Sequence, residues 1–166
     1  MLIDLLDEDD WSVLRDARLR AVRQSPEVFG AALAREELFR EQHWRARLRT
    51  SQWFVARDGA VPGDVVGLVN MIQEPASPPD DRHVMALWVE PGRRRTGVAT
   101  ALLVAASAAA RSGGARTLSA WVVDDDVAGV DLAVRNAFVV TGERQRLPRE
   151  PERVESRYVR ALDRPA

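Results

Sequence analysis

The residues best placed to do chemistry lie in one stretch, where an apolar segment ending at Val89 is followed by an arginine-rich turn and then by small residues. The turn reads Glu90-Pro91-Gly92-Arg93-Arg94-Arg95-Thr96-Gly97-Val98-Ala99. The first turn of a helix has N–H groups without intrahelical partners and the positive end of the peptide dipole, so a bound anion gains hydrogen bonds and charge complementarity together. Arginine adds a planar fork of donors that suits phosphate oxygens. We therefore predict a phosphate-binding site at this turn.

The spacing separates this turn from other phosphate-binding loops. It has no Gly-Lys-Ser/Thr ending, and no Gly-x-Gly-x-x-Gly follows an N-terminal strand. The turn instead fits Arg/Gln-x-x-Gly-x-Gly/Ala, with Arg94, Gly97 and Ala99 at the fixed positions. This pattern resembles the pyrophosphate-binding motif of the GNAT superfamily of N-acetyltransferases, which hold acetyl-coenzyme A. An arginine-rich turn that caps a core helix is the alternative interpretation of these six residues.

Composition excludes several kinds of site. The chain has 166 residues, 46% hydrophobic and 30% charged, which is typical of one globular domain. Its formal net charge of −1 and the lack of an aromatic and basic platform predict no nucleic-acid partner. Without cysteine there is no disulfide, thiolate zinc site or acyl-cysteine. His43 and His83 lie too far apart for a metal-ligand spacing, so we predict no metal.

The N-terminal segment is acidic, and no apolar run approaches the roughly 20 residues that a bilayer span needs. We therefore expect neither export nor a membrane partner, and we expect a cytoplasmic protein. Lysine is absent throughout, which excludes self-acetylation on lysine side chains.

Hydrophobic periodicity predicts alternating strands and helices. The predicted strands are residues 2–6, 53–57, 65–73, 83–89, 117–123, 138–146 and 154–162. The predicted helices are residues 9–24, 34–49, 96–111 and 127–135. Leu38, Trp44 and Leu48 are expected to share a buried face, the segments 58–63, 75–81 and 148–151 are expected to connect strands, and strand 83–89, helix 96–111 and strand 117–123 make one right-handed βαβ unit. The fold class is α/β (α+β), with a mixed, mostly antiparallel sheet of six to seven strands and about four flanking helices.

The order of motifs extends the resemblance over nearly the whole chain. Residues 18–22, 25–30 and 44–48 look like the front end of many bacterial GNAT sequences, whose first two helices frame the acceptor pocket. Trp121-Val122-Val123 and the downstream segment are similar to the family's later strand, helix and Gly-Phe-x-x-x-Gly sequence. The matching downstream positions are Asp126, Leu132, Phe138, Thr141 and Gly142. The resemblance implies a single N-acetyltransferase-like domain over residues 1–166, with splayed central parallel strands.

The resemblance also implies which residues hold acetyl-coenzyme A. Main-chain groups of Leu87 and Val89 are expected to pair with the pantetheine arm, and the Val89 N–H is the expected donor to the thioester oxygen. Arg93 is expected nearer solvent or the 3′-phosphate. Asp126 is a candidate for orienting water near the thioester, with helix capping as the alternative. The residues expected around the pyrophosphate are Arg94, Arg95, Thr96, Gly97, Val98, Ala99 and Thr100.

Four positions depart from the family's pattern. The usual capping asparagine is Asp126, the family alanine is Gly129, and the glycine before the phenylalanine is Ala137. The tyrosine commonly assigned to protonate the leaving thiolate is Ala133, which cannot donate a proton. Tyr158, on the predicted last strand, is interpreted as a packing residue, with a substitute proton donor as the alternative. The general acid is therefore unknown.

The general base is also open. Family members often carry a carboxylate three or four residues before the valine, where this chain has Met85 and Ala86. His83 on the same strand is a candidate base with a suitable intrinsic pKa, and an ordinary surface or strand-end histidine is the alternative. Three carboxylates are candidates for binding a cationic amine, with solvated surface charge as the alternative: Glu36, Glu37 and Glu74.

Two functional hypotheses follow. The first is an N-acetyltransferase that moves an acetyl group from acetyl-coenzyme A directly to the primary amine of a small molecule or peptide in a ternary complex. The second is a catalytically degenerate coenzyme A-binding sensor or subunit of the same fold, which Ala133 favours. A homodimer is compatible with either. The acceptor pocket is expected near residues 25–34 and 147–154, which carry no readable code for the amine.

Overall fold

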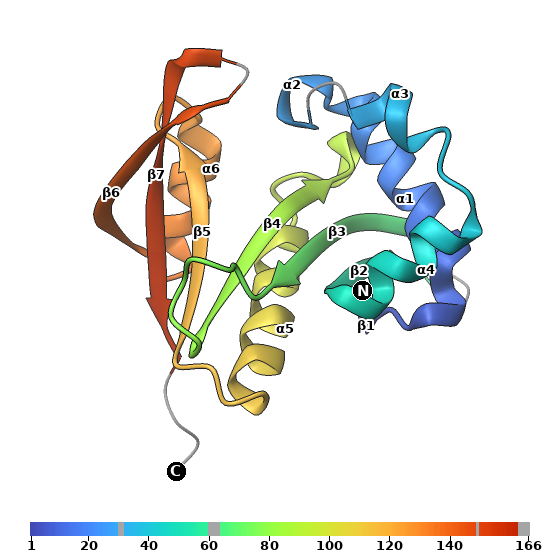
Figure 1. Cartoon of the computed structure of the whole chain (residues 1–166), viewed down its shortest axis with the longest axis horizontal. Helices are drawn as coiled ribbons and strands as arrows, with labels where there is room; N and C mark the ends of the chain where they lie inside the picture. Colours follow the sequence, from blue (N-terminus) through green and yellow to red (C-terminus); the bar gives the residue numbers. More distant parts are fainter. Residues whose placement is uncertain (30–31, 60–63, 149, 163–166) are drawn as a thin grey trace. The chain divides into compact units, whose positions relative to one another are not determined.

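The computed structural model describes residues 1–29, 32–59, 64–148 and 150–162. Within these limits the chain forms two compact units that interleave in the sequence. The first comprises Met1–Ile72 and Ala86–Ala105, and the second comprises Gln73–Met85 and Ala106–Ala166. Seven strands are hydrogen-bonded in the order β1-β2-β3-β4-β5-β7-β6 (Figure 1). The predicted α/β fold with a mixed sheet is confirmed, and the sheet has seven strands.

The first unit holds an antiparallel meander and most of the helices. Its strands are β1 (Leu2–Leu5), β2 (Gln52–Asp58) and β3 (Asp64–Ile72), and β4 (Asp81–Val89) begins in the second unit and ends in the first. Its helices are η1 (Glu8–Asp10), α1 (Trp11–Gln24), α2 (Pro26–Phe29), α3 (Ala32–Glu36), α4 (Glu41–Thr50) and η2 (Pro91–Arg93). Helix α5 (Val98–Ser112) also starts in this unit.

The core of the first unit brings the start of α5 close to the sheet. A Cβ added to Gly67 on β3 would lie 2.8 Å from Val98 Cγ1 and 3.1 Å from the carbonyl oxygen of Trp88. Only glycine therefore leaves room for the helix start at this distance. Leu14, Trp44 and other apolar side chains fill the rest of this core. The arginine-rich turn is thus anchored at both ends, by β4 and by the buried side chain of Val98.

The second unit combines β5 (Thr117–Val123), α6 (Val127–Arg135), β6 (Val139–Leu147) and β7 (Glu150–Ala161) with the first residues of β4. Strand β7 pairs antiparallel with both β5 and β6. Strands β4 and β5 pair in parallel, from Asp81 opposite Thr117 to His83 opposite Ser119. This pairing sets polar side chains of the two strands beside one another. The predicted splay of β4 from β5 concerns residues beyond these three pairs and stays a prediction.

The predicted helix over residues 34–49 is wrong, because α3 ends at Glu36 and α4 begins only at Glu41. Arg40 is extended between them, with φ −85° and ψ 168°, and His43 Nδ1 accepts from its N–H at 3.1 Å. Leu38 lies in this break with 80% of its surface exposed, so its predicted burial is also wrong. Phe39 packs against the core instead.

Several predicted boundaries also move. Helix α1 begins at Trp11 rather than residue 9, because the Asp7 side chain accepts from Asp9 N at 2.8 Å and caps η1 ahead of it. Strand β4 begins at Asp81, two residues early, and β7 begins at Glu150, four residues early, so the connection predicted over residues 148–151 is shorter. Residues 60–63 of the predicted turn at 58–63 lie outside the described residues, as does residue 149.

Candidate functional site

The arginine-rich turn presents backbone donors at the start of α5. Residues 91–97 are exposed, and the first intrahelical bond runs from Ala101 N to Gly97 O at 2.9 Å. Within residues 1–29, 32–59, 64–148 and 150–162, the amides of Gly97, Val98 and Ala99 have no acceptor. Thr96 Oγ1 donates to Arg93 O at 2.6 Å and closes the turn from within. The predicted anion-binding donors therefore have no hydrogen-bond partner among the described residues, as expected of a helix start that binds an anion.

The backbone of the turn is held in an uncommon conformation. Arg95 has φ 61° and Gly97 has φ 90°, both in the left-handed region. A non-glycine residue there costs on the order of 1–3 kcal/mol, and such strain collects at ligand sites. A Cβ at Gly97 would meet nothing within 4 Å, so the space above this residue is open. Strained backbone, open space and unpartnered amides together fit a diphosphate group.

The three arginines of the turn have different partners. Arg93 forms an exposed ion pair with Asp58. Arg94 Nε donates to Val89 O and its NH2 group to Ser25 Oγ, both at 3.3 Å. Arg95 is exposed and has no ion pair or side-chain hydrogen bond within the described part of the chain. Arg95 is therefore the cation most available to a ligand.

At the end of β4, the main chain is hydrogen-bonded on the side that faces β3. Glu90 N donates to Val66 O on β3 at 2.9 Å. Because successive residues of a strand direct their main-chain groups to opposite sides, those of Leu87 and Val89 point away from β3. Ala86, with φ 54°, interrupts the regular strand just before them. This orientation supports the predicted use of Leu87 and Val89 by the pantetheine arm.

In the second unit, Asp126 has the role of a helix cap. Its Oδ1 accepts from Gly129 N at 3.0 Å at the start of α6, and its side chain is exposed. A Cβ at Gly129 would lie 2.6 Å from Asp126 Oδ2, so the family alanine does not fit beside this cap. The capping interpretation is supported, and a role in orienting water stays a prediction.

The other departures from the family pattern have distinct surroundings. Ala133 on α6 is buried, with 6% of its surface exposed. Ala137 has φ 61°, the left-handed conformation that explains why the family has glycine there. Tyr158 lies half-buried on β7, opposite Ala120 and Val140.

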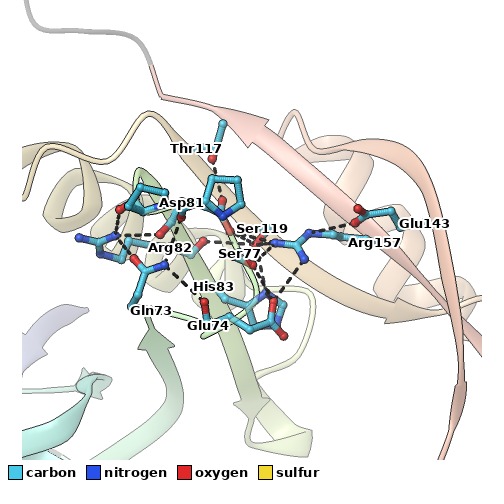
Figure 2. Close-up of polar contacts among 12 residues, drawn as sticks. Gln73, Glu74, Ser77, Asp81, Arg82, His83, Thr117, Ser119, Glu143 and Arg157 are labelled. Carbon is cyan, nitrogen blue, oxygen red and sulfur yellow. Dashed lines mark hydrogen bonds and ion pairs between the residues drawn. The ribbon is translucent and has the colours of Figure 1, made fainter.

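His83 lies in a buried polar cluster, which Figure 2 shows. Its Nδ1 is 3.1 Å from Ser119 Oγ and 3.9 Å from Glu74 Oε2. Ser119 Oγ donates to Asp81 Oδ2 at 2.6 Å, and one Arg157 NH2 group donates to both Ser119 Oγ (3.1 Å) and Asp81 Oδ2 (3.0 Å). The histidine itself is 3% exposed, so the expectation of a surface histidine is wrong.

The charges of the cluster act on both titratable neighbours. Burial lowers the pKa of His83 below its usual 6.5 and outweighs the charge of Glu74, which raises it; the charge of Arg157 lowers the pKa further, and the charge of Asp81 opposes this. Burial raises the pKa of Glu74, but hydrogen bonds from Ser77 and Trp121 and the charge of Arg157 outweigh it, and the pKa falls below its usual value. At neutral pH the imidazole is uncharged and the Glu74 carboxylate is ionised.

The three carboxylates that are candidates for binding the amine lie in different surroundings. Glu36 is 1% exposed and is bound by Arg18 and Arg47, with oxygen–nitrogen distances of 3.0–3.2 Å, so the solvated-charge interpretation is wrong for it. Burial raises its pKa, but the two arginines outweigh this and lower it. Glu37 is exposed and pairs with Arg23 at 2.8 Å. Glu74 belongs to the cluster around His83.

Asp81, Ser119 and Arg157 belong to this cluster but were not among the predicted site residues. A signal for two of them is present in the pattern: Asp81-x-His83 and Thr117-x-Ser119 place polar residues two apart on two neighbouring strands. Residues two apart on a strand face the same side, so parallel pairing brings both sets together. Arg157 comes from a strand 38 residues further on than Ser119 and carries no such signal.

No group of three or more histidine, aspartate and glutamate side chains among the described residues is arranged to hold a metal ion. In the part of the chain that the structure describes, no helix combines the length and apolar character needed to cross a lipid bilayer.

Comparison with known proteins gives a consistent result. The model of the acetyltransferase (GNAT) family matches residues 16–138. No curated protein matches the chain in sequence.

Solved structures match over nearly the full length. The chain is similar to a ribosomal-protein-alanine N-acetyltransferase from Brucella melitensis, with TM-score 0.75, 20% identity and coverage of 98% of this chain and 100% of the other. An aminoglycoside 6′-N-acetyltransferase complexed with coenzyme A gives TM-score 0.74 and 17% identity, with full coverage of both chains. An N-acetyltransferase from Staphylococcus aureus Mu50 gives TM-score 0.73 and 17% identity, with 98% of each chain covered. At these identities the likeness shows a shared fold.

Proposed function

The chain belongs to the GNAT family of acetyltransferases, and on that premise we propose that it moves an acetyl group from acetyl-coenzyme A to a primary amine by direct transfer in a ternary complex. The observation that carries the proposal is the set of amides at Gly97, Val98 and Ala99, beside the Arg95 guanidinium, none of which has a partner among the described residues. Acetyl-coenzyme A supplies the acetyl group as a thioester and carries the diphosphate that these donors fit.

The turn binds the diphosphate mainly through its backbone. The side chain of Val98 is buried, so this residue contributes its N–H alone, and Gly97 contributes a donor without covering it. Arg95 adds positive charge, and Arg94 adds a second fork of donors once it leaves Ser25. Thr96 and Thr100 flank these groups in the turn and the first turn of α5.

The main-chain groups of β4 that point away from β3 orient the reacting end of the cosubstrate. Leu87 and Val89 offer N–H and C=O groups to the pantetheine amides, and the Val89 N–H donates to the thioester oxygen. A preorganised donor at a developing oxyanion is worth about 3–4 kcal/mol of barrier in other enzymes. Arg94 Nε holds the Val89 carbonyl at 3.3 Å in the structure, so we expect this contact to open on binding.

A second function is favoured by one observation. Ala133 stands where the family's proton-donating tyrosine is expected, and it is buried without a polar atom on its side chain. A coenzyme A-binding sensor or subunit needs the diphosphate turn and not the proton donor. Loss of general-acid catalysis typically costs about 10²-fold or more, so a slow enzyme is the intermediate outcome.

A thiol assay separates the two functions without background, because the chain has no cysteine. The protein is incubated with acetyl-coenzyme A and a panel of amines while free thiol is followed, and calorimetry measures cosubstrate binding. The panel includes an aminoglycoside and a peptide beginning with alanine, after the activities named for two structurally similar proteins. Amine-dependent thiol release supports the acetyltransferase. Tight binding with no amine-dependent release supports the sensor or subunit.

The proposal also includes the kind of acceptor, the oligomeric state and the location of the protein. The acceptor is a small molecule or a peptide, and a homodimer and a cytoplasmic location remain predictions from the sequence. Size-exclusion chromatography with light scattering of the purified chain tests the homodimer.

A further inference from the structure

A cavity of about 630 Å³ lies in the first unit, between α1, the end of β2 and the start of β3. This volume is in the range of small-molecule sites. One part of its wall is apolar and consists of Val13, Ala17, Leu19 and Val65. Among the described residues that line the cavity, none belongs to the turn at residues 94–99. The cavity is therefore separate from the predicted phosphate-binding site.

The rest of the wall is largely charged, and most of its charges are already paired. Three lining residues form ion pairs at 2.7–2.8 Å with side chains that do not line the cavity: Asp16 with Arg15, Arg23 with Glu37, and Arg57 with Asp4. Arg20 and Asp64 form no ion pair with any residue that the structure describes. Arg20 is therefore a lining cation that no described carboxylate compensates.

Contacts with the protein orient the Arg20 guanidinium. Its central carbon lies 5.5 Å from the centroid of the buried Trp88 ring, and one NH2 group donates to the carbonyl oxygen of Val65. Arg20 Nε is buried and has no acceptor among the described residues. A half-buried cation without a counterion gains from an anion beside it, and the planar guanidinium matches the geometry of a carboxylate.

We propose that this cavity binds a small organic monocarboxylate, with the carboxylate on Arg20 and an aliphatic chain against the apolar wall. The charges of the lining favour a single carboxylate, because its three arginines exceed its two aspartates by one. A second carboxylate would be repelled by Asp16 and Asp64. The inference does not depend on the proposed acetyl transfer, so either can fail without the other.

Calorimetry of the full chain without coenzyme A tests the ligand class. The probes share one chain length: hexanoate, its neutral amide hexanamide, and the dicarboxylate adipate. We expect hexanoate to bind about tenfold more tightly than hexanamide, because only the carboxylate forms charge-assisted hydrogen bonds. Adipate is expected to bind at least about threefold more weakly than hexanoate. The proposal is overturned if hexanoate does not bind up to about 10 mM, or if either other probe binds equally well.

Arg20→Gln tests where the carboxylate lies. The variant is expected to lower the affinity for hexanoate about tenfold and to leave that for hexanamide unchanged. Arg23→Gln is the matched control, because Arg23 lines the same cavity from the same helix but already pairs with Glu37. Its affinity for hexanoate is expected within about twofold of wild type. A folded Arg20→Gln variant with unchanged affinity would overturn the proposal.

Gln24→Glu provides the same test if Arg20→Gln does not fold. Gln24 is exposed, lines the cavity and follows Arg20 by four residues on α1, so a carboxylate there pairs with the guanidinium and competes with the ligand. The affinity for hexanoate is expected to fall about threefold, and an unchanged affinity would count against the site.

Gly97→Glu distinguishes the cavity from the turn at residues 94–99. It is expected to keep the affinity for hexanoate within about twofold of wild type, because the two sites share no residue. A loss as large as that expected for Arg20→Gln would assign the carboxylate to the turn and overturn the proposal.

Discussion

The turn at residues 94–99 and the cluster around His83 are both rich in polar groups, but they differ in how those groups are used. In the turn, amides of three successive residues and the exposed Arg95 guanidinium have no partners inside the described structure. In the cluster, Asp81 accepts from three side chains and Ser119 bonds to three. Unpartnered exposed donors suit a ligand, whereas saturated buried groups suit the holding of one orientation.

The difference predicts that the two regions fail in different ways. A change in the turn removes a ligand contact and leaves the core intact, since the turn is exposed. A change in the cluster strands a buried partner, which costs folding free energy. Binding and stability measured on the same variants therefore distinguish the two regions.

The largest effect is expected for Gly97→Glu. A carboxylate within about 4 Å of a diphosphate opposes binding by several kcal/mol even at a high effective dielectric constant, so affinity for acetyl-coenzyme A falls at least about 1,000-fold. Calorimetric titration measures it. Gly114→Glu is the matched control, because Gly114 also has a positive φ (83°) and open space but lies at the other end of α5. Equal losses in the two variants would contradict the anion site.

Asp81→Asn is expected to give the converse result. Removal of this buried charge leaves Arg157 partly uncompensated and lowers the free energy of unfolding by roughly 3 kcal/mol. Urea denaturation measures the loss, and calorimetry is expected to show affinity for acetyl-coenzyme A within about twofold of wild type. Lost affinity in a variant of unchanged stability would reverse the proposed division between the regions.

The arginines of the turn provide a finer comparison. Arg95→Ala is expected to weaken acetyl-coenzyme A binding about tenfold, because it removes a charge that has no other partner in the part of the chain that the structure describes. Arg93→Ala is expected to change affinity by about threefold or less, since Arg93 already pairs with Asp58 and exposed pairs contribute little. The dissociation constants of the two variants at one ionic strength test this order. A larger effect for Arg93 would move the phosphate contact to the start of the turn.

The smallest expected effect is a pH dependence of stability that belongs to the cluster. The pKa of His83 is lower in the folded chain than its usual 6.5, so the unfolded chain binds more protons just below that pH. The contribution of His83 to the free energy of unfolding is therefore fully present above about pH 6.5. It declines as the pH falls, by about 1.4 kcal/mol for each pH unit that separates the folded from the unfolded pKa. Urea midpoints between about pH 7.5 and 5.5 measure the decline. It is expected to vanish in His83→Gln, and its persistence there would assign it to other groups.

The sequence predicts a region well when the residues of that region lie close together along the chain. The turn was predictable because its donors, its glycine and its arginines are consecutive residues, and helix ends behave alike in all proteins. The cluster was not, because its members come from residues 74–83, 117–119 and 157, which only strand pairing brings together. The sequence therefore did not decide whether His83 is a general base or an ordinary surface or strand-end histidine.

The helical segment before β2 shows a second limit. Apolar spacing at Leu38, Trp44 and Leu48 fits one amphipathic helix, but tertiary packing favours Phe39 in the core and leaves Leu38 in solvent. Leu38 and Phe39 are adjacent apolar residues, so the apolar periodicity alone does not decide which of the two side chains is buried. The buried pairing of Glu36 with Arg18 and Arg47 joins residues that are 18 and 11 positions apart, so no local pattern indicates it.

A crystal structure of the protein with coenzyme A tests the central claim most directly. The account predicts diphosphate oxygens at about 3 Å from the amide nitrogens of Gly97, Val98 and Ala99, with Arg95 beside them. Coenzyme A bound elsewhere, with those amides covered by the protein's own side chains, would contradict it.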